Sequence, residues 1–172
     1  MTQGEEQDGI PFGRRVQKIV SGGQTGVDTA ALEFARANGI PYGGWVPKGR
    51  TNEDGLIPTH LSGLVETKSE DVAERTRLNV FASDATLVFI DGSDSPGTRK
   101  TVEFAVDAEK PHLVVDIRKG KAGCAQQIRA WLSANPVTVL NIAGPRASEA
   151  PEIGPRVNEV LDACLDQFIQ PK

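Results

Sequence analysis

The sequence contains few residues of the kinds that bind metals or form disulfides. Its 172 residues include only two cysteines and two histidines. Cys124 and Cys164 lie in stretches with helical spacing and neither has a CxxC partner, so we expect both to be small core residues. No group of histidine, cysteine and aspartate has metal-ligand spacing, which argues against a tightly bound structural metal.

Long apolar runs and an excess of positive charge are also missing. No apolar run approaches the ~20 residues that cross a bilayer, and the first residues have no apolar core like that of a signal peptide. We therefore expect a cytoplasmic protein without a membrane partner. The net charge of -4 argues against a dedicated nucleic-acid binder, because such proteins usually carry a basic domain.

What the sequence does contain is a regular alternation of strand and helix patterns. Residues 1–14 are charged, glycine-containing and without periodicity, which predicts a disordered leader, and residues 15–170 form one domain. Residues 47–69 are rich in proline and glycine and predict a long functional or disordered loop. The alternation predicts an α/β, three-layer Rossmann-like fold, with a mostly parallel sheet and helices on both faces. The expected strands are 16–20, 40–46, 85–91, 111–117 and 136–144; the expected helices are 27–39, one following Ser69, 101–110, 122–135 and 151–169.

A glycine-rich turn, SGGQTG (21–26), connects the first strand to the first helix. Glycines let a backbone approach a ligand closely, and the N-terminus of a helix favours an anion. Thr25 offers a hydroxyl and Gln24 an amide, while the carboxylate of Asp28 either caps the helix or faces the ligand. We expect a phosphate here; the alternative is a tight turn without a ligand.

A second loop of this kind, SDSPGTRKT (93–101), follows the strand 85–91. Gly97 and Thr98 can donate hydrogen bonds to phosphate, Arg99 and Lys100 supply positive charge, and Thr101 is expected to cap the next helix. Two such loops at the carboxyl ends of parallel strands would line one crevice, where open α/β sheets bind ligands. The alternative is a solvated loop.

Further polar residues lie beside predicted strand and helix ends. Lys48 and Arg50 could clamp a phosphate, and Glu53 and Asp54 could bind ribose hydroxyls, a divalent cation or a water. Each of the remaining residues is, taken singly, more often structural than functional; they are Arg75, Arg77, Asn79, Asn141 and Arg146.

Together, the motifs SGGQTGVDTAAL, GGWVPKGRTNEDGLIP, RTRLNVFASDATLVF, PGTRKT and LNIAGPRAS resemble the family called "putative molybdenum carrier". That family is placed with the circularly permuted YpsA-like branch of the SLOG superfamily, and the resemblance extends from Val16 to Phe168. It implies a Rossmann-like fold, a homo-oligomer, and binding of a nucleotide or of molybdenum cofactor, which carries a terminal phosphate. The ligand-binding residues that it implies are Gly22, Gly23, Gln24, Thr25, Gly26, Asp28, Gly97, Thr98 and Thr101, and less directly Lys48, Arg75, Asn79 and Arg146.

The chain departs from the related LOG enzymes, which cleave nucleoside monophosphates and carry the pattern PGGxGTxxE. Here the segment reads SPGTRKTVE, and Glu103 is shifted relative to Thr98. The leading hypothesis is therefore a carrier that binds molybdenum cofactor or a nucleotide without converting it. A hydrolase that cleaves an N-glycosidic or phosphate bond is the alternative, and a nucleotide-sensing module is a third. Asp28, Glu53, Asp54 and Glu103 are the acid and base candidates if the protein is an enzyme.

The apolar residues of the last two helices suggest contact between subunits. Trp131 lies on the helix predicted over 122–135, and an apolar stripe follows the C-terminal helix. This surplus predicts a homo-oligomeric contact. The stripe comprises Val157, Val160, Leu161, Leu165 and Phe168.

Overall fold

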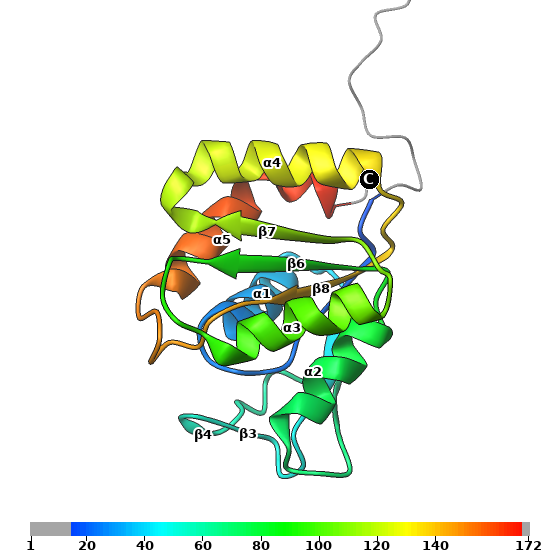
Figure 1. Cartoon of the computed structure of the whole chain (residues 1–172), viewed down its shortest axis with the longest axis vertical. Coiled ribbons are helices and arrows are strands. Elements are labelled where there is room, and N and C mark those ends of the chain that lie inside the picture. Colours follow the sequence, from blue (N-terminus) through cyan, green and yellow to red (C-terminus); the bar gives the residue numbers. More distant parts are fainter. Residues whose placement is uncertain (1–14, 170–172) are drawn as a thin grey trace, which may run out of the picture.

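The computed structural model describes residues 15–169. They form one six-stranded sheet in the order β5-β2-β1-β8-β6-β7, in which every neighbouring pair is parallel (Figure 1). This confirms the predicted α/β fold class. The sheet strands are β1 (Lys18–Val20), β2 (Tyr42–Val46), β5 (Leu64–Glu66), β6 (Ala85–Ile90), β7 (His112–Asp116) and β8 (Val139–Ala143).

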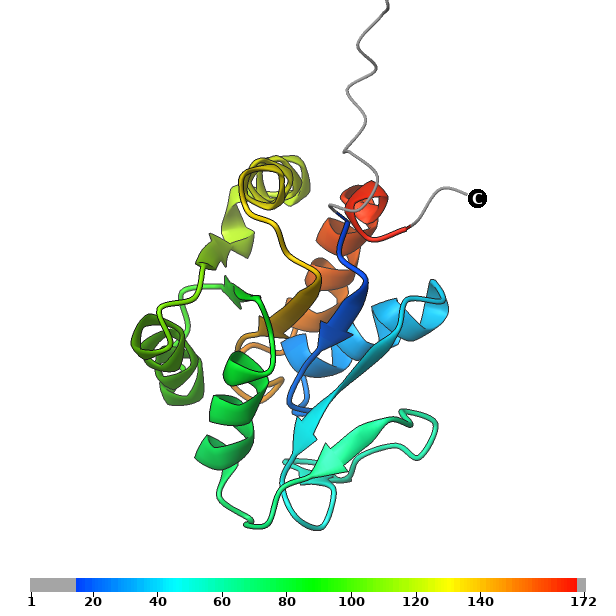
Figure 2. The same cartoon turned by 90° about the vertical axis from the view of Figure 1, so that its right-hand side faces the viewer.

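Helices cover both faces of the sheet, as Figure 2 shows. α1 (Val27–Ala37), α4 (Lys121–Ala134) and α5 (Ile153–Ala163) pack together on one face, and α2 (Val72–Phe81) and α3 (Pro96–Asp107) on the other. The run ATLVFI of β6 is buried along nearly its whole length, as expected for a strand covered on both faces. Burial of these apolar faces supplies the main stabilisation of the fold.

The order of the strands creates a crevice at their carboxyl ends. From β1 the chain runs outward through β2 to β5, then returns by α2 to β6 and β7, and α4 leads back to β8 between β1 and β6. The loops after β1 and β8 therefore lead to helices on one face, whereas the loop after β6 leads to α3 on the other. Ligands bind where neighbouring loops diverge in this way.

The segment 47–69 is more ordered than the predicted loop. It contains a hairpin of β3 (Thr51–Asn52) and β4 (Gly55–Leu56), and β5, which adds an edge strand beside β2. A small core of Leu32, Val46, Ile57, Leu61 and Leu64 holds the segment against α1 and β2. These strands have two or three residues, too few to show a period in the sequence.

The start of one helix differs from the prediction. α3 begins at Pro96, not at residue 101, because proline is well suited to the first helical turn. Thr101 is consequently inside the helix, and its hydroxyl donates to the carbonyl of Gly97 at 3.1 Å. α2, expected to follow Ser69, is capped by Asp71, whose carboxylate accepts the N–H of Ala73 at 3.0 Å.

The cysteines and the apolar C-terminal residues belong to the main core. Cys124 and Cys164 are buried and unbonded, which confirms their predicted place. Val157, Val160, Leu161 and Phe168 are buried as well, and Trp131 and Leu165 pack against the same core. The apolar surplus from which a subunit contact was predicted is therefore used inside the chain.

The two ends of the described chain are neighbours. The N–H of Val16 donates to the carbonyl of Gln167 at 3.1 Å. This contact lies beside the amino end of β1 (Figure 2). The predicted leader, residues 1–14, lies outside the described residues. From residue 15 to residue 169, no helix combines the length and apolar character needed to cross a membrane.

Candidate functional site

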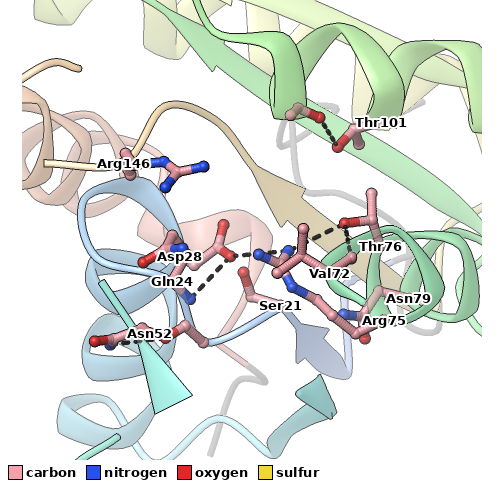
Figure 3. Close-up of polar contacts among 12 residues, drawn as sticks. Ser21, Gln24, Asp28, Asn52, Val72, Arg75, Thr76, Asn79, Thr101 and Arg146 are labelled. Atoms are coloured by element: carbon pink, nitrogen blue, oxygen red, sulfur yellow. Dashed lines mark hydrogen bonds and ion pairs between the residues drawn. The ribbon is translucent and has the colours of Figure 1, made fainter. Parts of the chain in front are cut away.

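A cleft at the carboxyl ends of the strands brings the two glycine-rich loops together, as predicted. Its residues come from the loop after β1, from α2, from the start of α3 and from the loop after β8 (Figure 3). The cavity in this cleft has a volume of about 50 Å³. This is room for a few waters or one oxyanion, because sites for whole small molecules measure roughly 300–1,000 Å³. The lining residues are Gln24, Asp28, Val72, Arg75, Thr76, Ser95, Gly97, Thr98, Thr101, Ala143, Gly144, Arg146 and Glu149.

The N-terminus of α3 presents free donors to this cleft. Among residues 15–169, the backbone N–H groups of Gly97 and Thr98 have no hydrogen-bond acceptor. The N-cap residue Ser95 does not cap the helix; its hydroxyl lies 2.6 Å from that of Thr98 and donates to Glu149 at 3.2 Å. Unpaired N–H groups at a helix start, with the positive end of the helix dipole, favour an anion.

The first glycine-rich loop contacts the carboxylate of Asp28. The side chain of Asp28 is buried, and its carboxylate accepts the N–H of Gln24 at 3.2 Å. The nearest cation is Arg75, whose Nη1 lies 3.7 Å from Oδ2. Burial raises the pKa of Asp28, and Arg75 and the loop N–H groups oppose that rise. A carboxylate of the protein itself thus faces the donors that were expected to bind phosphate.

Two guanidinium groups line the cleft from opposite sides. Arg75 of α2 lies flat on Gly22, where a Cβ atom would stand 2.3 Å from its Nη1, and its buried Nε has no partner. Arg146, in the loop after β8, uses its Nε to contact Glu149 at 3.3 Å, and lies across the cleft from Arg75 (Figure 3). Both predicted arginines are therefore placed to contact an anion in the cleft.

Gln24, Thr25 and Glu53 form a junction between loops. The hydroxyl of Thr25 donates to Glu53 and accepts the N–H of Ala147 at 3.0 Å. Glu53, at the turn of the β3–β4 hairpin, also accepts the N–H of Ser148 at 3.0 Å, while Gln24 accepts the N–H of Glu53 at 3.0 Å. The hydrogen bonds from Ser148 and Thr25 lower the pKa of Glu53. This Glu53 junction joins the hairpin to the loop that precedes Asp28 and to the loop that carries Arg146.

Two glycines of the first loop allow close packing. A Cβ atom on Gly23 would meet Ile57 and Val46, each at 2.8 Å, and one on Gly26 would stand 2.4 Å from the carbonyl oxygen of Pro145. Both have positive φ angles, which glycine adopts without strain.

Several predicted site residues lie away from the cleft. Arg99 pairs with Asp94, and Glu103 with Lys100 at 3.0 Å, on the exposed side of α3. Lys48 and Asp54 are exposed and do not line the cleft. The buried amide of Asn79 donates to the carbonyl of Trp45 and accepts its N–H, at 3.0 and 2.8 Å, which is a structural role in holding β2.

The sequence interpretation missed Ser95 and Glu149. Ser95 precedes a proline at a helix start, a capping signal that was available. Glu149 lies three residues after Arg146, and only the structure shows that it reaches Ser95. Between residues 15 and 169, no group of three or more histidine, cysteine, aspartate or glutamate side chains is placed to hold a metal ion.

Comparison with known proteins identified a family and a solved structure. No curated protein matches the sequence. A crystal structure named "Putative molybdenum carrier protein", from Syntrophus aciditrophicus SB, is 43% identical and superposes with a TM-score of 0.85, covering 88% of this chain and 96% of the other. The model of the circularly permutated YpsA SLOG family matches residues 19–165. The chain therefore belongs to the circularly permutated YpsA SLOG family.

Proposed function

We propose that this protein binds a ligand through a phosphate or similar oxyanion in the cleft, and carries the ligand without converting it. Molybdenum cofactor, whose terminal phosphate would enter the cleft, is the leading candidate, and a nucleotide is the alternative. The name of the 43% identical structure, a molybdenum carrier, supports this choice.

The observation that carries the proposal is the convergence of donors on one small cavity. The N–H groups of Gly97 and Thr98 and the side chains of Arg75 and Arg146 all border it, as does the Thr98 hydroxyl, which would turn from Ser95 to a bound anion. Charge-assisted hydrogen bonds of this kind are the strong ones. Because the volume of this cavity is only about 50 Å³, the rest of a cofactor or nucleotide would lie outside it.

The hydrolase alternative rests on Asp28. Its buried carboxyl has a raised pKa, as a general acid requires. The other three acid and base candidates do not line the cleft: Glu53 belongs to the junction, and Asp54 and Glu103 are exposed. A carrier needs anion donors but no acid or base positioned for cleavage. The cleft has several donors and, of the four acid and base candidates, only Asp28, which favours the carrier.

Native mass spectrometry of freshly purified protein tests which ligand is bound. Calorimetric titration with molybdate, phosphate and a nucleoside monophosphate then tests the cleft directly. Thr98→Val should weaken binding by roughly 10–150-fold, the equivalent of one charge-assisted hydrogen bond. Thr59→Val, at an exposed position outside the cleft, is the matched control and should bind like the wild type. Equal affinities in the two variants would contradict the proposed site.

A nucleotide panel separates carrier from hydrolase. The protein is incubated with nucleoside monophosphates and dinucleotides, and released base, ribose phosphate and inorganic phosphate are quantified. The carrier proposal expects no product above a control without protein. Product formation that is lost in Asp28→Asn would establish the hydrolase instead.

Homo-oligomerisation also stays a proposal, but with a different surface. Since Trp131 and the C-terminal stripe pack in the core, the exposed apolar residues to test are Val106 on α3 and Val114 on the edge strand β7, with exposures of 58% and 37%. Light scattering of the wild type and of Val106→Lys tests this surface. A monomeric wild type would refute the proposal.

A further inference from the structure

We infer that binding of an oxyanion in this cleft is coupled to the uptake of one proton by Asp28. The inference rests on the proposed function, that the cleft binds an oxyanion, and adds how the charge of that anion is balanced.

The charged side chains of the empty cleft are already balanced. Two carboxylates, Asp28 and Glu149, face two guanidinium groups, Arg75 and Arg146. A tetrahedral oxyanion with two negative charges would leave this partly buried site with a negative excess. Unbalanced charge in a poorly solvated site is costly, and such sites commonly neutralise a titratable group instead.

Of the two carboxylates, Asp28 is the one that is weakly held. Glu149 is contacted by the Ser95 hydroxyl at 3.2 Å and by the backbone N–H and Nε of Arg146, each at 3.3 Å. Its side chain is 20% exposed, whereas that of Asp28 is only 4% exposed. Asp28 accepts the N–H of Gln24 at 3.2 Å and is contacted more weakly by Ser21 and Gly22, and its 3.7 Å separation from Arg75 is longer than a hydrogen bond.

The surroundings of Asp28 hold one adjacent counter-charge, and the anion would compete for it. Arg75 comes from α2; the loop after β1 supplies the neutral Gln24 and Ser21; the loop after β8 supplies Arg146, already contacted by Glu149. The charged side chains of α3 near this site, Arg99 and Lys100, are exposed and paired elsewhere. An anion that attracts Arg75 therefore weakens the one cationic contact that opposes burial of the carboxylate.

Protonation turns Asp28 from a repelling group into a donor. The proton comes from solvent, binds a carboxylate oxygen, and the resulting O–H can donate to the anion. Because binding takes up a proton, affinity falls as the pH rises, by up to about tenfold per pH unit between the pKa values of Asp28 in the free and the bound protein.

Calorimetry counts this proton directly. Molybdate and sulfate are titrated into the whole protein at about pH 6 and about pH 8, in pairs of buffers with different ionisation enthalpies; sulfate does not itself titrate in this range. We expect up to about one proton taken up per anion in the wild type. Asp28→Asn should bind without proton uptake and with an affinity independent of pH. The control Glu103→Gln, outside the cleft, should behave like the wild type.

The possible results are distinguishable. Binding by the wild type without proton uptake at either pH refutes the inference and leaves the proposed function intact, and uptake that persists in Asp28→Asn refutes the assignment to Asp28. Failure of every oxyanion and phosphate ester to bind refutes the proposed function, and the inference with it. If Asp28→Asn does not fold, infrared difference spectra of the wild type decide: a protonated carboxyl band must appear on binding.

Discussion

Replacing Gly26 by alanine should destabilise the protein by steric contact between two loops of the site. Gly26 has φ 75° and ψ -123°, a conformation that costs other residues about 1–3 kcal/mol. In addition, its new Cβ atom would stand 2.4 Å from the carbonyl oxygen of Pro145 and 2.9 Å from the N atom of Ala147. Overpacking of this kind costs a further ~1–3 kcal/mol, so we expect a total loss of about 2–6 kcal/mol.

Gly120→Ala separates the two contributions. Gly120 has φ 86° and ψ 158°, also a region that glycine favours, but a Cβ atom there would have no atom within 4 Å. It should lose only the backbone part. A difference of ~1–3 kcal/mol corresponds to roughly 2–12 °C in the melting temperature of a domain of this size. Thermal unfolding followed by circular dichroism measures both variants, and a Gly26→Ala variant at least as stable as Gly120→Ala would refute the steric argument.

Three further predictions concern the junction, the cleft and the cysteines. The pKa of Glu53 is lowered from 4.5 in the folded protein, so its stabilising contribution is present above that value and is lost as the pH falls through the folded pKa. The difference in melting temperature between wild type and Glu53→Gln should therefore shrink on acidification. A constant difference would contradict this prediction. Arg146→Gln should weaken molybdate binding about tenfold or more, measured by calorimetry beside Arg77→Gln, whose side chain does not line the cleft. Burial raises the pKa of Cys164 to about 12 and also raises that of Cys124, so a thiol reagent at mildly alkaline pH should label both only after unfolding.

The sequence predicted those parts of the site that depend on local pattern. The apolar run of β6 indicated a strand, and the parallel order placed Gln24 and Asp28 in the same cleft as Gly97 and Thr98. Glycine, proline and threonine at strand-to-helix junctions carry this information because their backbone preferences act over a few residues.

The contacts between distant segments could not be predicted in this way. Glu53 lies 28 residues from Thr25 and 95 from Ser148, and no periodicity relates such positions. For the same reason its place in a predicted loop suggested a ligand group, whereas in the structure Glu53 joins loops. The start of α3 was missed for a different reason: serine, proline and glycine favour loops and helix starts alike.

The pairing of the Val16 N–H with the Gln167 carbonyl determines where the protein can be immobilised or fused to another domain. Both residues lie near the amino end of β1, whereas the cleft lies beyond the carboxyl ends of the strands. A sensor chip, a fluorescent fusion or a scaffold linked at either residue would leave the cleft facing outward. A short linker between the two would also allow circular permutation, in which the joined chain is opened at another position.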